Sequence, residues 1–112
     1  MNKPILDDHS CLTPEATHDI LHLASKLACE CPRHLIIILN AVREFKAYEQ
    51  SCGINNPKDL AIHQWLESSA VNFDQMISAT ISQLARLEGM VDEHNCIVPL
   101  GTAGADHSNK AT

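Results

Sequence analysis

Aromatic side chains make up only 4% of this 112-residue chain, although 45% of its residues are hydrophobic. Phe, Tyr and Trp usually supply much of the bulk of a core, so this core must be built from aliphatic side chains. Long hydrophobic runs are also lacking, since the longest is the five residues 35–39 (LIIIL). A membrane-spanning helix needs about 20 apolar residues, so we expect no membrane association. The length predicts a single domain.

Basic residues are few, and they do not cluster. The net charge is −6, with 8 Lys and Arg against 14 Asp and Glu. Nucleic-acid binding requires clustered Lys and Arg to neutralise phosphates, so we expect no direct contact with nucleic acid. The first residues (MNKPILDD) lack the apolar core of a secretory signal, and the 5 cysteines are then expected to be reduced thiols in the cytoplasm.

Catalytic patterns are missing as well. The chain has only 4 glycines and no phosphate-cradling glycine loop. We find no Ser/His/Asp order and no paired carboxylates that would support hydrolysis. The sequence therefore predicts a protein that is not an enzyme.

The most informative segment of the chain is residues 32–51, because the rest of the fold must pack around it. Its five opening aliphatics span more than one helical turn, so no single face can hold them. The rest of the segment is helical in pattern, because six residues recur at alternating spacings of three and four: Leu35, Ile38, Val42, Phe45, Glu49 and Cys52. Pro32 suits a first helical position and Gly53 the residue just past the end. We predict a buried central helix.

Two further helices flank this one. Thr13-Pro14-Glu15 is a helix start, with a capping hydroxyl, a proline and an acid, and this helix should run to about Ala28. Asn56-Pro57 repeats the cap-then-proline pattern, and no helix breaker follows before Gly89. We predict an all-α antiparallel three-helix bundle over residues 13–89, with an N-terminal arm (1–12) and a C-terminal tail (90–112) that is disordered after residue 100.

We expect the third helix to be longer than the second. At about 32 residues it would extend roughly three turns beyond the central helix at the Cys29 end. Its apolar residues there must be covered by the tail segment 96–100 or by a second copy of the chain. We predict a homodimer, or a complex with another protein, whose interface contains Ile36, Ile37, Ile81, Leu84 and Leu87.

The cysteines provide the candidate site. Cys31 stands where a helix would begin, and the helix dipole there lowers a thiol's pKa, which predicts a reactive thiolate next to Cys29. The alternative is two small residues in a tight turn. At the other end of the bundle Cys52 and His63 would lie near Cys11 and His18. The candidate metal ligands are Cys29, Cys31, Cys52 and His63, and no other cofactor is expected.

Taken together, three motifs resemble a known module: CECPRHL, then EF-x-x-YE-x-x-C, then NP-x-D-x-x-x-H. They resemble the small C-terminal helical domain that follows the DNA-binding half in some bacterial MerR-type regulators, a half that this sequence does not contain. The resemblance implies a bacterial regulatory or oligomerisation module. The function we expect is therefore non-enzymatic protein interaction, with a thiol-redox or metal sensor at Cys29 and Cys31 as the alternative.

Overall fold

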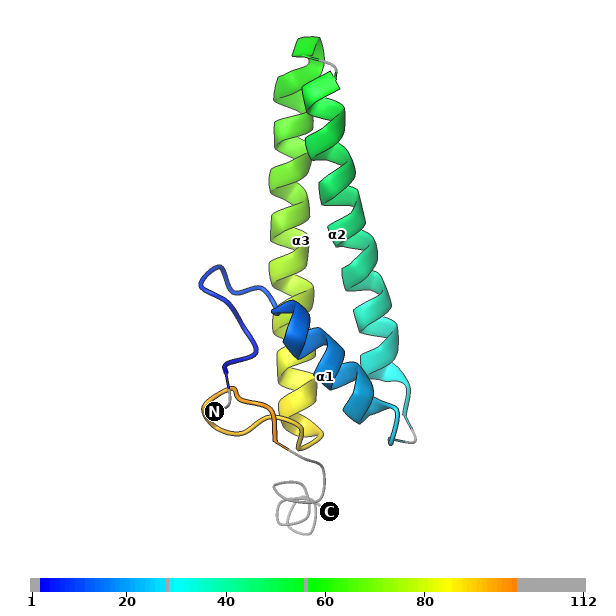
Figure 1. The fold of residues 1–112 in the computed structure, drawn as a ribbon, viewed down its shortest axis with the longest axis vertical. Helices are drawn as coiled ribbons and strands as arrows, with labels where there is room; N and C mark the ends of the chain where they lie inside the picture. Colours follow the sequence, from blue (N-terminus) through cyan, green and yellow to red (C-terminus); the bar gives the residue numbers. More distant parts are fainter. Residues whose placement is uncertain (1–2, 28, 56, 99–112) are drawn as a thin grey trace.

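The computed structural model describes residues 3–27, 29–55 and 57–98. These residues contain three α-helices: α1 (Pro14–Ala24), α2 (Cys31–Asn55) and α3 (Leu60–Leu87), with a short 3-10 turn, η1 (Pro57–Asp59), before α3. No strand occurs among them, only isolated β-bridges, so the all-helical prediction is confirmed. None of the described helices is both long enough and apolar enough to cross a bilayer. Figure 1 shows α2 and α3 as a tall pair, with α1 crossing its lower half.

α1 begins as its sequence predicts. The Thr13 side chain accepts a hydrogen bond from the backbone N–H of Ala16 (3.1 Å), and Pro14 occupies the first turn. One face of the helix is buried, through Ala16, Ile20 and Leu23, and the other is solvated. Because α1 has only 11 residues and ends at Ala24, it covers the lower part of the α2–α3 pair and not its upper part.

α2 and α3 form a helical hairpin. Three side-chain contacts link them: Arg43 in the middle of α2 with Asp74, and Glu49 and Gln50 near its end with His63 and Glu67 near the start of α3. The two helices therefore run in opposite directions. α2 continues through Gly53 to Asn55, and the prediction that it ends before Gly53 is wrong. Proline disfavours helical geometry in the residue before it, so Pro57 is the feature that limits the helix.

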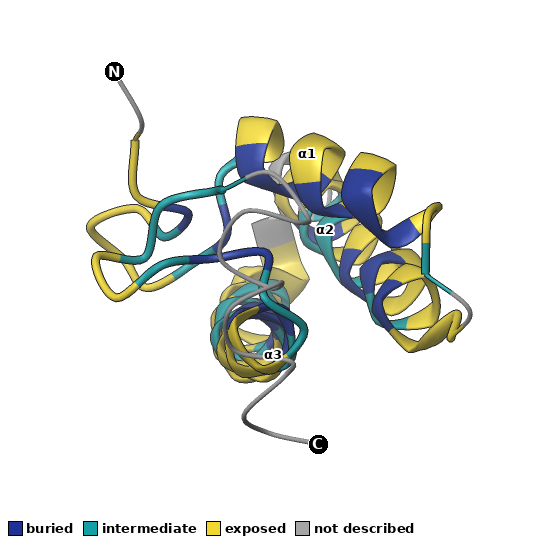
Figure 2. Ribbon diagram, turned by 90° about the horizontal axis from the view of Figure 1, so that it is seen from below, coloured by how far each residue is buried: buried dark blue, intermediate teal, exposed yellow. Residues whose placement is uncertain are grey.

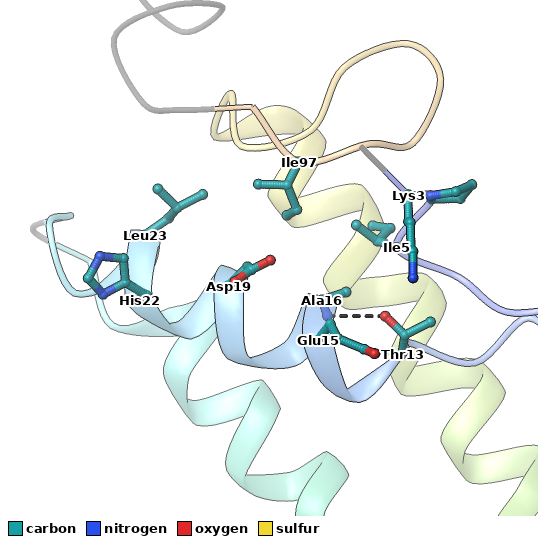
Figure 3. Close-up of a pocket in the computed structure, with 10 residues that line it drawn as sticks. Lys3, Ile5, Thr13, Glu15, Ala16, Asp19, His22, Leu23 and Ile97 are labelled. Carbon is teal, nitrogen blue, oxygen red and sulfur yellow. Dashed lines mark hydrogen bonds between the residues drawn. The ribbon is translucent and has the colours of Figure 1, made fainter. Parts of the chain in front are cut away.

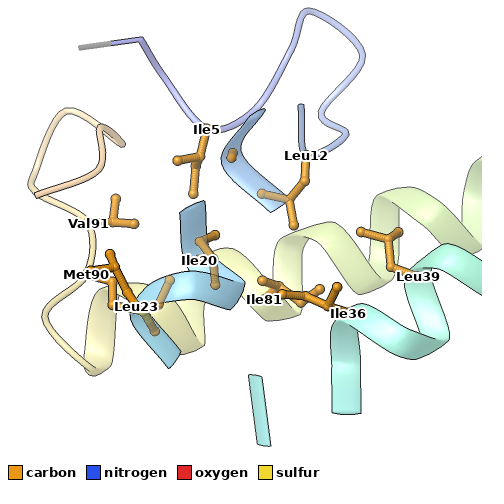
Figure 4. Close-up of a cluster of buried hydrophobic side chains, with 11 residues drawn as sticks. Ile5, Leu12, Ile20, Leu23, Ile36, Leu39, Ile81, Met90 and Val91 are labelled. Carbon is orange, nitrogen blue, oxygen red and sulfur yellow. The ribbon is translucent and has the colours of Figure 1, made fainter. Parts of the chain in front are cut away.

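The core lies where α1, α2 and α3 meet (Figure 4). Ile36 and Ile81 are completely buried in it, so they cannot form the interface predicted for them. The reason is that α1 and both terminal segments cover this region, where Ile20, Leu12 and Met90 belong to the same cluster. Of the other predicted interface residues, Leu84 is half-buried, whereas Ile37 is 52% and Leu87 73% exposed.

The N-terminal segment is part of this core. Ile5 and Leu12 are fully buried, and the backbone N–H of Ile5 donates to the Asn95 carbonyl (2.7 Å). Pro4 also forms a β-bridge with Cys96, so the two terminal segments pack against each other. The division into arm, bundle and tail therefore fails at residues 3–12 and 90–98. The tail predicted to be disordered after residue 100 lies outside the described residues.

Candidate functional site

One flank of the helical hairpin carries no helix. Seen from below, α1 lies across one side of the α2–α3 pair, and no described helix covers the opposite side (Figure 2). Exposed large side chains recur along both helices, and we infer from their helical spacing that they lie on this side. We call this surface the open face and define it by Ile38, Phe45 and Tyr48 on α2 and Ile62, Phe73, Met76 and Leu87 on α3.

The open face arises from a second stripe along each helix. On α2, Leu39 and Glu49 are buried and Val42 is half-buried, whereas Ile38 and Phe45, seven residues apart, are exposed. Residues seven apart lie on nearly the same line of a helix. The same line extends downward to Cys31 and upward to Cys52 (again seven residues each way).

Midway along the hairpin, an ion pair fixes the level of α2 against α3. Arg43 donates to both carboxylate oxygens of Asp74 (2.7 and 3.2 Å) and to the Leu12 carbonyl (2.6 Å). Burial alone would raise the pKa of Asp74, but hydrogen bonds from Arg43 and Ser78, with the Arg43 charge, hold it below its usual value. Ser78 in turn accepts from the backbone N–H of Leu12 (2.9 Å).

At the lower end of α2, two thiols lie together. The Sγ atoms of Cys29 and Cys31 are 2.9 Å apart, and both residues are exposed. Its side-chain hydrogen bond with Cys29 and the charge of that residue raise the pKa of Cys31 above its ordinary value. Cys31 is the first residue of α2, and the reactive thiolate predicted there stays a prediction.

At the upper end, Cys52 and His63 form the second pair. Cys52 Sγ lies 3.5 Å from His63 Nε2, and His63 Nδ1 lies 2.6 Å from a carboxylate oxygen of Glu49. Glu49 is buried, so it holds the imidazole ring in one orientation with Nε2 directed at the thiol. A carboxylate that fixes a histidine in this way is found beside activated thiols and beside metal-bound histidines, and it also occurs as a buried structural pair.

The four predicted metal ligands thus occur as two pairs. Cys31 and Cys52 are 21 residues apart on one helix, or about 32 Å at 1.5 Å per residue. Within one chain a single ion cannot contact both pairs, and the described residues contain no group of three or more metal-binding side chains. The predicted grouping with Cys11 and His18 is wrong. Cys11 lies at the level of Asp74, because α1 starts at mid-height on the hairpin.

A cavity of about 910 Å³ lies beside α1 (Figure 3). The N-terminal segment, α1 and Ile97 line it, with Lys3, Glu15, Asp19 and His22 at its rim. None of its lining residues among the described part of the chain is a cysteine. Its described lining contains no cysteine or serine nucleophile, so the cavity does not support the activated-thiol interpretation.

Cys11 should be far less reactive than the exposed thiols. Burial, a hydrogen bond to Asp74 and the charge of that carboxylate raise the pKa of Cys11 to about 11. At pH 8 only about one Cys11 in 1,000 is then a thiolate, so we expect alkylation about 100-fold slower than for a thiol of ordinary pKa. Mass spectrometry of tryptic peptides during iodoacetamide labelling measures this, with a cysteine-containing peptide as the reference. Labelling of Cys11 at the reference rate would contradict the geometry.

The sequence predicted the pair Cys29–Cys31 and the pair Cys52–His63, but it did not predict the open face. Phe73 and Met76 were part of an apolar pattern that also contains buried residues such as Ala70 and Ile81. The heptad spacing from Cys31 to Cys52 was the available signal. Comparison of the chain with protein-family models, curated proteins and solved structures finds no match.

Proposed function

We propose that this protein is a non-enzymatic regulatory module that works as a homodimer, with two hairpins packed through their open faces into an antiparallel four-helix bundle. The observation that carries the proposal is the open face itself. A monomer of this size rarely exposes a continuous apolar surface along two whole helices. The resemblance to the C-terminal module of MerR-type regulators points the same way.

The size of the open face suits a second copy. Its seven side chains, together with Ile37 and Trp65 at its edge, are each between 38% and 73% exposed. Large apolar and aromatic side chains have areas near 200 Å², so this surface amounts to about 1,000 Å². A standard interface buries about 800 Å² on each partner. One additional hairpin is therefore enough to cover it.

The open face is also self-complementary. A two-fold axis that crosses the hairpin midway between residues 41 and 42 would place Ile38 of one copy against Phe45 of the other. An axis midway between residues 74 and 75 on α3 would likewise pair Phe73 with Met76, and Ile62 with Leu87. The Arg43–Asp74 ion pair puts these two midpoints at one level, as a single axis requires. Each α2 then lies along the α2 of the other copy, in the opposite direction.

A double substitution tests the dimer. Phe45→Glu with Phe73→Glu places charges in the open face, and the dimer dissociation constant should rise at least about 100-fold, since buried unpaired charge is costly. Leu21→Glu is the matched control, because Leu21 is exposed on α1, outside the open face. Sedimentation equilibrium at 1–100 µM should find a dimer for the wild type and for the control. A wild-type monomer over this range would refute the proposal.

A second candidate function rests on the close approach of Cys29 Sγ and Cys31 Sγ (2.9 Å). Two thiols so near each other can form a disulfide by exchange with a small disulfide such as oxidised glutathione. One thiolate attacks the small disulfide, which forms a mixed disulfide and releases the first glutathione thiolate. The second thiolate then attacks the protein sulfur of that mixed disulfide, which closes the Cys29–Cys31 disulfide and releases the second glutathione. Titration in glutathione redox buffers, followed by mass spectrometry, should then show loss of two hydrogens in the peptide that contains Cys29 and Cys31.

A further inference from the structure

We infer that the dimer holds two identical tetrahedral metal sites, each built from Cys29 and Cys31 of one copy and Cys52 and His63 of the other, with zinc as the ion that fits best. This inference rests on the proposed dimer and deepens it by naming a ligand. In one chain the two pairs are separated by the length of α2, and neither is a complete site.

The same two-fold axis that pairs the apolar residues brings the two half-sites together. Cys31, Ile38, Phe45 and Cys52 lie at intervals of seven on one line of α2, and the line is symmetric about its midpoint. When α2 lies along the opposite α2 of the second copy, Cys31 faces Cys52. Cys29 adjoins Cys31, and His63 adjoins Cys52. Each end of the bundle then gathers three thiols and one imidazole.

The donor set is that of zinc. Three cysteines and one histidine form a common structural zinc site, with Zn–S near 2.3 Å and Zn–N near 2.05 Å. In a tetrahedron these bonds place sulfur and nitrogen about 3.6 Å apart. Cys52 Sγ and His63 Nε2 are already 3.5 Å apart. The Cys29 and Cys31 sulfurs, at 2.9 Å, would have to separate by about 0.9 Å to reach the spacing of two zinc-bound thiolates.

Glu49 completes the arrangement. A histidine that binds zinc through Nε2 usually donates its Nδ1–H to a carboxylate, which fixes the ring and strengthens the ligand. Glu49 accepts that hydrogen bond from His63 at 2.6 Å and is itself buried. Metal binding releases the protons of the three thiols to solvent, so affinity should increase with pH.

Two half-site variants test the shared site, with Zn²⁺ itself as the probe. One chain carries Cys29→Ser with Cys31→Ser, and the other carries Cys52→Ser with His63→Ala. Each variant alone should bind zinc at least about 100-fold more weakly than the wild type. Refolding the two together under reducing conditions creates heterodimers with one intact site, so the mixture should recover between about a quarter and a half of the wild-type zinc.

Further variants test which residues contribute to zinc binding. Cys96→Ser and His18→Ala remove a thiol and an exposed imidazole outside the site, and both should keep wild-type binding. Glu49→Gln should weaken binding about 10- to 100-fold without removing it. X-ray absorption of the wild-type zinc protein should show three sulfur ligands and one nitrogen ligand. Circular dichroism of each variant before the titration confirms that the helices are folded.

The outcomes separate this inference from the proposed function. A wild-type dimer that takes up no zinc, or a mixture that recovers none, overturns the shared site and leaves the dimer standing. Zinc retained by the Cys29→Ser, Cys31→Ser variant alone overturns it too, because the Cys52 and His63 pairs of both copies would then lie at one end. A monomer by native mass spectrometry overturns both. Complementation in a dimer supports both.

Discussion

Arg43→Ala should lower the free energy of unfolding by about 3 kcal/mol at pH 7, whereas Arg33→Ala should lower it by less than about 0.5 kcal/mol. Both arginines lie on α2, and each forms an ion pair with a carboxylate. The difference lies in exposure. The Asp74 side chain is 9% exposed, and the loss of Arg43 leaves its buried charge without a counter-ion, with the Ser78 hydroxyl still donating a hydrogen bond to it. Arg33 and Glu30 are each more than half exposed, so water replaces their contact.

Arg43 also connects three parts of the chain. Besides Asp74 on α3, it binds the carbonyl of Leu12 in the N-terminal segment, and removal of its side chain deprives that carbonyl of its hydrogen-bond donor. Urea unfolding followed by circular dichroism measures the loss. Protein concentration must be equal in all samples, because the stability of a dimer depends on concentration. Equal losses for the two arginine variants would show that the Arg43 pair is not buried in solution.

The effect should depend on pH in a definite direction. The folded-state pKa of Asp74 is below its unfolded value, so its contribution to stability is present above the ordinary carboxyl pKa and is lost as pH falls through the lower folded value. In Arg43→Ala, burial remains but the main stabilising charge is gone, so the pKa of Asp74 should rise. As the pH falls, Asp74 is therefore protonated in the variant before it is protonated in the wild type, which removes its buried charge. The difference in unfolding free energy between wild type and variant should decrease between pH 6 and pH 3. A constant difference over that range would contradict the account.

Local signals in the sequence predicted the helices well. The Thr13-Pro14 start of α1 is confirmed by the capping hydrogen bond to Ala16. The predicted boundary at Pro57 is confirmed, although the 3-10 turn delays α3 to Leu60, and the cap predicted at Asn56 lies outside the described residues. These features are readable because each depends on residues within four positions of one another, so no tertiary contact is needed to recognise them.

The packing of each helix was harder to predict, because periodicity gives the spacing of a stripe but not its partner. Leu35, Ile38, Val42 and Phe45 form one pattern in the sequence, yet in the structure Ile38 and Phe45 are the exposed members. The pattern is therefore two adjacent lines, one facing α3 and the other facing solvent. Only the position of α1, on the opposite flank, distinguishes them. The two cysteine pairs were predicted from residue type, but their separation required the length of α2.

The terminal segments show the same limit. Residues 3–12 have no periodicity, and half of their side chains are polar, so they were predicted to be an arm. Their burial depends on contacts with residues more than 60 positions away, such as the hydrogen bond from the Leu12 N–H to Ser78 and that from the Ile5 N–H to Asn95. Such long-range contacts leave no local pattern, so a sequence-based assignment will treat the segment as external.

Ile5→Ala provides the direct test, and it should destabilise the protein by about 3 kcal/mol. Ile5 is fully buried in the cluster with Ile20 and Val91, and truncation of its side chain leaves a cavity that the three surrounding segments cannot close without breaking their hydrogen bonds. Leu21→Ala removes a similar number of carbon atoms from an exposed site on α1 and should cost less than about 1 kcal/mol. Urea unfolding of both variants at one concentration compares them. Equal stabilities would mean that the N-terminal segment is detached in solution. A large loss for Ile5→Ala would instead make residues 3–12 a part of the domain, needed to hold α1 in place on the flank opposite the open face.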